Sequence, residues 1–451
     1  MKRLIVFARR AAFVAIAFVG LSALAEPKHV LVVTAVQGFP HSSRPLAEKV
    51  IAGLGEQTGL WTVDYVRGGP DGKGTQDFEK MTREALKKVD LIIFANTTLD
   101  LPLPDKEAFL DFVKSGKGFV GMHSASDTFH NWQPYIDMLG GEFQIHHEQV
   151  RIEAINEDRN HPATREMGPT FGVFDEIYII KNYDGTKVHR LLTLDRHPNT
   201  GVPGEYPVAW CKQYGKGRVF YTSLGHREDV WLSDAYQQHI LGGIKWAMGL
   251  EKGDAAPQDP TVQLSKEEKK DGFKPLFNGK NMDGWHLRHK EGRQSWSVQN
   301  GELVNVVGKD EHGTDLVSDD KYKDFIVRFE YMVPKGSNSG FYLRGRHEIQ
   351  IFDDQGSNIK EPGMHSNGAI YVTEPATTMV SRKTGDWQTV EAKMVGDKVT
   401  VFLNGVKVHD NLTVNKPTGS ELDDKVGEPG SFFLQGDHGS VAFRNIRVKK
   451  L

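Results

Sequence analysis

The spacing of apolar residues changes once along the chain, near residue 250, and this change limits the possible folds more than any other feature. Before it, short apolar runs alternate with stretches of helical spacing; after residue 272, only short alternating runs remain. Alternating strands and helices favour a mostly parallel sheet with helices on both faces. Many short strands separated by turns favour a β-sandwich or jelly roll. The 451-residue chain is therefore predicted to be multidomain: a doubly wound α/β domain followed by an all-β sandwich.

The α/β domain is predicted to span residues 26–250. Its first apolar run is rich in β-branched residues and can be buried on both faces, as in a parallel sheet. The expected strands are residues 29–35, 61–66, 90–95, 118–123, 208–212 and 217–223. The expected helices are residues 45–55, 79–88, 106–115 and 235–248. A polar and charged stretch at 251–271 follows and is predicted to be a linker.

The all-β domain is predicted to span residues 272–451. The expected strands are residues 325–332, 340–344, 348–352, 369–372, 389–395, 399–403, 432–435 and 441–448. The pairs Gly396-Asp397 and Asn404-Gly405 separate three of these strands, and the second pair is a strong hairpin signal.

The first 25 residues are predicted to be a secretory signal peptide. A basic start with Lys2, Arg3, Arg9 and Arg10 precedes a short apolar run and an A-x-A site at 23–25. The alternative is a membrane anchor, but the apolar run is about half of the ~20 residues that a span needs. We therefore expect a periplasmic or secreted protein with no membrane span after cleavage; general and twin-arginine export both stay open.

Charge and cysteine content exclude several classes of function. The net charge is −3, so the chain has no basic excess to neutralise nucleic-acid phosphates, and we expect no nucleic-acid partner. One cysteine, Cys211, excludes an intrachain disulfide, a Cys-rich zinc site and a Cys-ligated iron–sulfur cluster.

Histidines follow three predicted strands of the first domain, where ligands of a doubly wound sheet bind. His41, His123 and His226 can converge there in one pocket, and neutral imidazoles suit a divalent metal, with Glu176 or Glu148 as a fourth ligand. Alternatively, these loop histidines are solvated or cap helices. The sequence names no certain cofactor and leaves the metal open.

The first domain resembles the trehalose-utilisation (ThuA-like) family. The resemblance is carried by GFPHSS, GMHSASDTF, the His161-Pro162 pair, the DEIY run at 175–178 and GKGRVFYTSLGH. It implies the fold of class I glutamine amidotransferases, related to flavodoxin, and a link to oxidised disaccharides. Amidotransferases place a cysteine nucleophile where this chain has His123, and Cys211 lies in a predicted core strand, so thiol chemistry is not expected. The implied pocket comprises His41, His123, Asp127, Glu176 and His226.

In the second domain, strand alternation sorts polar side chains onto one face. It predicts that Tyr342 and Arg344 share a face, as do Glu348 and Gln350. These residue types suit a sugar, with a tryptophan for ring stacking. The candidates for stacking are Trp285, Trp296 and Trp387. The alternative is an ordinary solvated sheet face.

The second domain resembles the 3-keto-disaccharide hydrolase family, whose fold is a concanavalin-like jelly roll. The shared motifs are GFKPLFNGKNMDGW, NSGFYLRG, HEIQIFDD, GDWQTVEAKMVGDKVTVFLNG and LQGDHGSVAFRNIRVK. The resemblance implies cleavage of 3-keto-glycosides. The implied site residues are Asn338, Tyr342, Arg344, Glu348 and Gln350, then His365, Gln435 and His438.

A ketone at C3 of a pyranose suggests a chemical route. It acidifies the C2 hydrogen, and the resulting enolate can expel the C1 substituent before water adds. Glu348, His365 or His438 could be the base, and Arg344 or a divalent metal could stabilise the enolate. Ordinary hydrolysis would instead pair Glu348 with Asp353 or Asp354, and a third possibility is that the jelly roll only binds carbohydrate.

The keto-sugar substrate must come from another protein. The one Gly-x-Gly-x-x-Gly match, residues 116–121, runs into an expected strand instead of following a strand and opening a helix, so it is not a dinucleotide-binding motif. A separate sugar 3-dehydrogenase is therefore the expected supplier of the small-molecule substrate.

Overall fold

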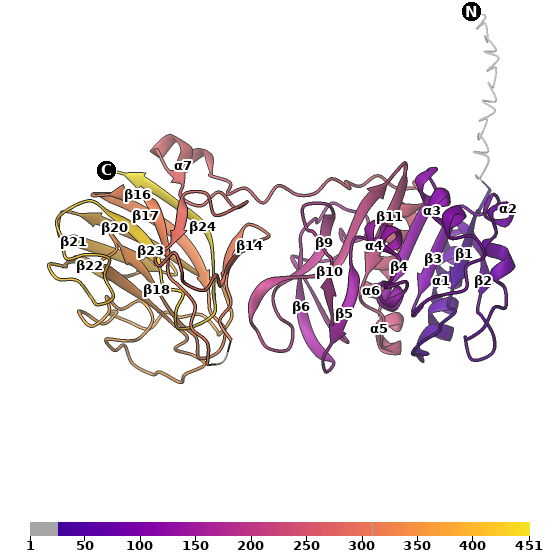
Figure 1. Cartoon of the computed structure of the whole chain (residues 1–451), viewed down its shortest axis with the longest axis horizontal. Helices are drawn as coiled ribbons and strands as arrows, with labels where there is room; N and C mark the ends of the chain where they lie inside the picture. The colour runs from indigo at the N-terminus through magenta and orange to yellow at the C-terminus, as the bar shows by residue number, and fades with distance from the viewer. Residues whose placement is uncertain (1–25, 309) are drawn as a thin grey trace, which may run out of the picture.

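The computed structural model describes residues 26–308 and 310–451, and these form two domains joined by an extended segment (Figure 1). The predicted signal peptide, residues 1–25, lies outside the described residues and stays a prediction. In the part of the chain that is described, no helix has the length and apolar character needed to cross a membrane.

Five parallel strands form one half of the first domain's sheet. They are β1 (Lys28–Val33), β2 (Trp61–Val66), β3 (Leu91–Ala95), β4 (Gly118–Met122) and β11 (Gly217–Thr222), in the order β2-β1-β3-β4-β11. Along β1, Val30 and Val32 enter one apolar core while Leu31 and Val33 enter another. Burial on both faces is what the β-branched sequence predicted.

Helices cover both faces of this parallel half, as predicted. On one face lie α1 (Arg44–Thr58), α5 (Glu228–Leu232) and α6 (Asp234–Ala247); on the other lie α2 (Arg83–Leu86), α3 (Lys106–Lys114) and α4 (Gln133–Leu139). The helix expected at 79–88 is instead a 3-10 turn, η1 (Phe78–Met81), followed by α2. Thr82 separates the two because it is extended and caps α2 through its hydroxyl.

Tight packing of α6 makes a prediction about stability. A Cβ at Gly242 would lie 1.9 Å from the Pro162 carbonyl oxygen, a backbone atom. We expect Gly242→Ala to lower the free energy of unfolding by about 1–3 kcal/mol through overpacking. Gly53 in α1 has open space around its Cβ position, so Gly53→Ala should raise the same quantity by about 0.5–1 kcal/mol. Urea denaturation checks both; an equal gain for the two variants would contradict the packing argument.

The same sheet continues in four further strands, of which the sequence predicted only part of one, residues 208–212. These are β10 (Pro203–Tyr214), β9 (His189–Arg196), β6 (Val150–Asn156) and β7 (Thr170–Asp175), all antiparallel to their neighbours. A separate two-stranded ribbon pairs β5 (Glu142–His146) with β8 (Tyr178–Lys181). This extension brings Glu176 and Tyr178 toward the carboxyl ends of the parallel strands.

The predicted linker is ordered at both ends. Its first part packs on the first domain, where the Ala256 carbonyl accepts a hydrogen bond from His189 and the Gln258 amide donates one to the Arg190 carbonyl. Its second part belongs to the other domain: Val262 lies in the sandwich core, and helix α7 (Lys266–Asp271) follows. The segment that crosses between domains is therefore residues 259–261.

Two antiparallel sheets form the second domain. The larger contains β14 (Trp296–Gln299), β15 (Glu302–Asn305), β24 (Val441–Lys450), β17 (Phe325–Met332), β20 (Gln388–Val395), β21 (Lys398–Leu403) and β22 (Val406–Thr413), with β12 (Lys274–Pro275) beside β24. The smaller has the order β13 (Trp285–Leu287), β16 (Leu316–Tyr322), β23 (Gly430–Leu434), β18 (Asn338–Leu343) and β19 (His347–Phe352). The predicted sandwich is confirmed, but residues 369–372 form isolated bridges rather than a strand.

Candidate functional site

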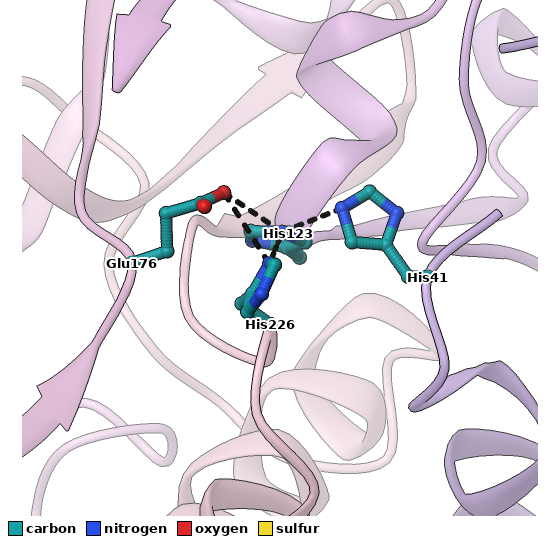
Figure 2. A group of neighbouring side chains, drawn as sticks. All are labelled: His41, His123, Glu176 and His226. Carbon is teal, nitrogen blue, oxygen red and sulfur yellow. Dashed lines mark hydrogen bonds and ion pairs between the residues drawn. The ribbon is translucent and has the colours of Figure 1, made fainter. Parts of the chain in front are cut away.

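Four side chains from distant parts of the sequence meet at the carboxyl ends of the parallel strands (Figure 2). His41 follows β1, His123 follows β4, His226 follows β11, and Glu176 lies between β7 and β8. We call these residues the histidine–glutamate quartet. The convergence predicted from three strand ends is present, and of the two carboxylates considered the structure brings Glu176 into the group.

The ligating atoms of the quartet are close to one another. His123 Nε2 lies 3.2 Å from His41 Nε2, 3.3 Å from His226 Nδ1 and 3.8 Å from Glu176 Oε1. Glu176 Oε1 lies 3.3 Å from His226 Nδ1. All four atoms fall within 4.8 Å of one another, so they surround a single point.

His123 is the central member of the quartet. It starts the 3-10 helix η2 (His123–Asp127) with a φ of +49°, in the left-handed region that costs a non-glycine residue about 1–3 kcal/mol. Its Nδ1 donates to the Ser223 carbonyl at 2.9 Å, which leaves the Nε2 lone pair facing the quartet. Full burial holds the pKa of His123 well below its usual value, so the ring is neutral.

The other members have different electrostatic surroundings. Burial, helped by the nearby charge of His226, lowers the pKa of His41 to about 4. The pKa of His226 is raised because Glu176 accepts its hydrogen bond. The second oxygen of Glu176 lies 3.2 Å from Nδ1 of His146, and the Tyr178 hydroxyl lies 3.0 Å from His123 Nε2. His146 and Tyr178 face each other on β5 and β8.

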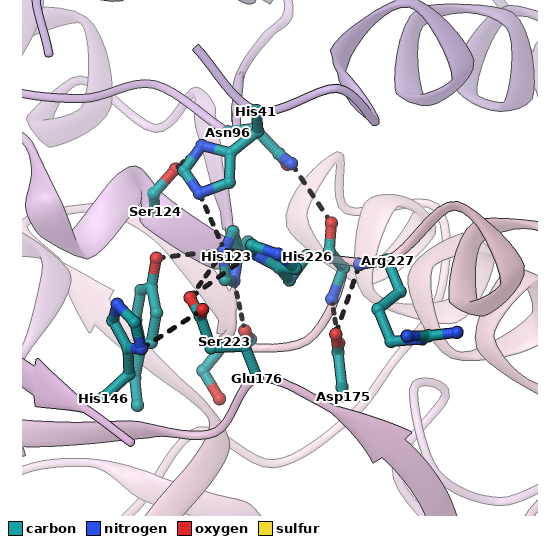
Figure 3. Close-up of polar contacts among 12 residues, drawn as sticks. His41, Asn96, His123, Ser124, His146, Asp175, Glu176, Ser223, His226 and Arg227 are labelled. Carbon is teal, nitrogen blue, oxygen red and sulfur yellow. Dashed lines mark hydrogen bonds and ion pairs between the residues drawn. The ribbon is translucent and has the colours of Figure 1, made fainter. Parts of the chain in front are cut away.

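Backbone contacts fix the loop that carries His226 (Figure 3). Asp175 accepts hydrogen bonds from the backbone N–H groups of Gly225 at 2.7 Å and Arg227 at 3.2 Å, on either side of the histidine. The Asn96 amide donates to the Gly225 carbonyl. Burial raises the pKa of Asp175 to about 6. These contacts hold His226 in place before any ligand arrives.

Two expected pocket residues, Asp127 and Glu148, have contacts outside the quartet, whereas Cys211 lies in the core as predicted. Asp127 contacts His130 at 2.7 Å rather than the quartet, because it ends η2 and points toward β5. Glu148 lies beside Asn199, whose side-chain amide donates a hydrogen bond to the backbone carbonyl of Glu148. Cys211 is buried in β10, and burial raises its thiol pKa, in agreement with the predicted core position.

A second candidate site lies on the outer face of the smaller sheet in the second domain. Tyr342 on β18 pairs with Glu348 on β19, and Gly340 pairs with Gln350. The Tyr342 hydroxyl donates to Glu348 Oε2 at 2.7 Å, and its ring stacks on Phe433 with centroids 3.7 Å apart. The face predicted by alternation therefore exists for these residues.

The Glu348 carboxylate lies over the backbone of its neighbouring strand. A Cβ at Gly340 would stand 2.2 Å from Glu348 Oε1, so this approach requires glycine. Burial raises the pKa of Glu348 to about 7, opposed by the Tyr342 hydrogen bond and the nearby charge of His438. A carboxyl group with this pKa is suited to accept or donate a proton near neutral pH.

Amide side chains lie beside this carboxylate. Gln350 donates to the Asn338 side chain and to the His365 carbonyl, each at 3.2 Å. The Oε1 atoms of Gln350 and Gln435 are buried without a hydrogen-bond partner among the described residues. Buried polar atoms of this kind call for a partner, which a sugar hydroxyl can supply. His438 is exposed beside Asp437, which it contacts.

Three expected site residues have structural positions instead. The strand β18 ends at Leu343, and Arg344 takes a φ of +53° in the hairpin, beside Val317 and Leu422, which pack with Tyr342. Its guanidinium donates to the carbonyls of Lys323 and Val426. Trp285 and Trp296 belong to the sandwich core and donate to the carbonyls of Leu276 and Thr314, so neither ring is free to stack on a sugar.

The acidic pair after β19 is also structural. Asp353 accepts hydrogen bonds from Gly336, Gly356 and Thr384. Asp354 accepts from the Asn367 backbone and the Ser381 hydroxyl. Both carboxylates are used by the loops that they hold, so neither forms a catalytic pair with Glu348.

Comparison with known proteins identifies relatives of each domain. Residues 29–247 match the family model for trehalose utilisation (ThuA), and residues 272–449 match the model for the 3-keto-alpha-glucoside-1,2-lyase-like domain. A 3-keto-disaccharide hydrolase from Bacteroides thetaiotaomicron is 29% identical over 298 residues, covering 54% of this chain and 98% of the relative.

Similar solved structures come from Parabacteroides and Bacteroides species. A candidate glycosyl hydrolase from Parabacteroides distasonis is 28% identical, with a TM-score of 0.31, and covers 40% of this chain and 99% of its own. A candidate ThuA-like protein from Bacteroides uniformis is 20% identical, with a TM-score of 0.42, and covers 50% of this chain and 93% of its own. The two family matches thus give the chain a ThuA-like domain at residues 29–247 and a 3-keto-alpha-glucoside-1,2-lyase-like domain at residues 272–449.

Proposed function

We propose that this protein is an exported enzyme that cleaves the glycosidic bond of 3-keto-glycosides, with Glu348 as the base. The observation that carries the proposal is the buried Glu348 carboxylate, whose pKa is raised to about 7 on a sheet face with unsatisfied amide groups. The family of the second domain and the activity in the name of the Bacteroides thetaiotaomicron relative support the substrate class. The basic and apolar pattern of residues 1–25 supports export.

The reaction begins with proton transfer to Glu348. The carboxylate takes the C2 proton of the keto-sugar, and the electron pair of the C–H bond forms an enolate with the C3 oxygen. The enolate then expels the C1 oxygen, which takes up a proton and leaves as the released sugar. Addition of water across the resulting double bond gives C1 a hydroxyl group and C2 a hydrogen, so the net reaction is hydrolysis.

The residues around Glu348 position its carboxylate and the substrate. Tyr342 holds one oxygen of Glu348 through its hydroxyl, which leaves the other oxygen, above Gly340, for the C2 proton. The Oε1 atoms of Gln350 and Gln435, which lack a partner among the described residues, can accept hydrogen bonds from ring hydroxyls. Arg344 is held in the hairpin and has no part in this step.

The pKa of Glu348 predicts the pH dependence. The base acts only when it is deprotonated, so kcat/KM should rise with pH through about 7 and then level off. The Tyr342 hydrogen bond lowers this pKa, so Tyr342→Phe should move the rise to higher pH. Measurement of kcat/KM from pH 5 to 9 for both proteins checks the shift; an unmoved or downward-shifted profile would count against Glu348 as the titrating base.

The activity itself is tested with the full chain. We expect 3-keto-trehalose to be cleaved and trehalose to remain intact, as followed by mass spectrometry. In heavy water, the released keto-sugar should carry deuterium at C2, because water supplies that hydrogen after elimination. Cleavage of unoxidised trehalose would favour ordinary glycoside hydrolysis, and sugar binding without turnover would make the second domain a binding module.

A sugar 3-dehydrogenase is the proposed supplier of the substrate. Such an enzyme oxidises the C3 hydroxyl and needs a redox cofactor. The one Gly-x-Gly-x-x-Gly match of this chain, residues 116–121, leads into strand β4 and does not join a strand to a helix as a dinucleotide-binding turn does.

A further inference from the structure

We propose that the histidine–glutamate quartet of the first domain binds one divalent first-row transition-metal ion, with Zn²⁺ as the reference ion. The ligands are His41 Nε2, His123 Nε2, His226 Nδ1 and one oxygen of Glu176 (Figure 2). This inference concerns the other domain and does not depend on the reaction proposed for Glu348.

The spacing of the quartet fits such an ion. Zinc binds imidazole nitrogen and carboxylate oxygen at about 2.0–2.2 Å, so neighbouring ligand atoms of a tetrahedral site lie about 3.3–3.5 Å apart. The separations of His123 Nε2 from the nitrogens of His41 and His226 are 3.2 and 3.3 Å. Glu176 Oε1 lies 3.3 Å from His226 Nδ1. Small side-chain rotations suffice to place an ion among them.

Hydrogen bonds within the quartet do not account for its arrangement. Because His123 Nδ1 donates to the Ser223 carbonyl, a neutral His123 offers one lone pair at Nε2. Three groups stand within 3.3 Å of that atom: His41 Nε2, His226 Nδ1 and the Tyr178 hydroxyl. One lone pair cannot accept three well-formed hydrogen bonds, whereas one cation satisfies several inward-facing lone pairs together.

Outer contacts hold the proposed ligands as they do in known metal sites. A ligating histidine commonly donates its other ring nitrogen to a carbonyl or carboxylate, which fixes its tautomer. His123 does so with Ser223, and His41 Nδ1 lies 3.4 Å from the Ser124 hydroxyl. The other Glu176 oxygen contacts His146. The left-handed φ of His123 adds strain that a ligand position would explain.

One member of the quartet reaches the surface. The side chain of His226 is 22% exposed. Phe39, which is 63% exposed, has its ring centroid 4.9 Å from that of His41. An ion can therefore enter from the side of the loop after β1. On this side the exposed ring of Phe39 would lie beside the ion. The ion would supply Lewis acidity toward an oxygen atom that approaches along Phe39.

Zinc binding by the full-length protein tests the proposal. After dialysis against chelator, isothermal titration with ZnCl₂ should give one ion per chain for the wild type. His123→Asn and His41→Asn should each weaken binding by at least about 100-fold, since even loss of a supporting residue outside the ligand set costs about 10–100-fold. Zinc should raise the Tm of the wild type and leave the Tm of these variants unchanged.

A matched control comes from a second histidine–carboxylate group in the same domain. His130 contacts Asp127 and Glu142 at 2.7 and 2.9 Å but lies outside the quartet. His130→Gln should keep the wild-type stoichiometry and affinity. If His123→Asn does not fold, His41→Asn decides, because its loop is at the surface. The proposal is overturned if the wild type binds no stoichiometric zinc, or if the quartet variants bind zinc as the wild type does.

Discussion

Replacing Glu348 by glutamine is expected to lower kcat for 3-keto-glycoside cleavage by about 10² to 10⁴-fold, the usual contribution of a general base. Glutamine keeps the size of the side chain and can still accept the Tyr342 hydrogen bond, which is 2.7 Å long. It cannot take a proton from C2. A steady-state assay on 3-keto-trehalose, with circular dichroism to confirm folding, measures the effect.

A matched control for this substitution lies on the other sheet. Glu391 on β20 forms an ion pair with Arg328 at the surface of the domain. Glu391→Gln should leave kcat within about twofold of the wild type, because exposed pairs contribute at most about 1 kcal/mol to stability. Full activity of Glu348→Gln would show that the base is another residue.

Replacing Gly340 by alanine is expected to produce the second large effect. The new methyl group would stand 2.2 Å from Glu348 Oε1, so the carboxylate must move by about an ångström. A displacement of that size can cost about 10²-fold in rate. The backbone of Gly340 lies in an ordinary strand, β18, so alanine fits its conformation. We therefore expect kcat to fall about 10²-fold while the protein stays folded.

The control for Gly340→Ala is a glycine of the same domain with free space around it. Nothing lies within 4 Å of a Cβ placed at Gly427. Gly427→Ala should keep the wild-type kcat and urea midpoint. Equal kcat values for the two variants would mean that the position of Glu348 does not limit the reaction.

Local pattern predicted the parallel half of the first domain because its central strands, β1, β3 and β4, are buried apolar runs. Most of the antiparallel extension was missed since its strands carry other signals: in β7 buried and exposed residues alternate, and β10 contains Pro203 and Pro207 ahead of the predicted residues 208–212. Long-range pairing, not local pattern, places these strands. The strand-end rule brought His41, His123 and His226 together, but nothing local indicated that His146 would reach Glu176 from the β5–β8 ribbon.

In the second domain, alternation correctly placed Glu348 and Gln350 on the face opposite the core residues Ile349 and Ile351. It did not reveal that the chain leaves the strand after Leu343 and that Arg344 takes a left-handed φ in the hairpin, where its guanidinium donates to loop carbonyls. The tryptophans show another limit. A tryptophan on a short strand suits a sugar face and a sandwich core equally, and only the packing of both sheets shows that Trp285 and Trp296 are internal.

The short crossing between the domains has a kinetic consequence. Residues up to Gln258 are bonded to the first domain, and Val262 is already in the core of the second, so residues 259–261 span at most about 10 Å. A direct hydrogen bond from Trp387 to Asp195 adds to this tether. A molecule still bound to one domain therefore meets the other at a millimolar effective concentration, on the order expected for short tethers. Dilution of the enzyme would leave that encounter unchanged, whereas two separate proteins would lose it.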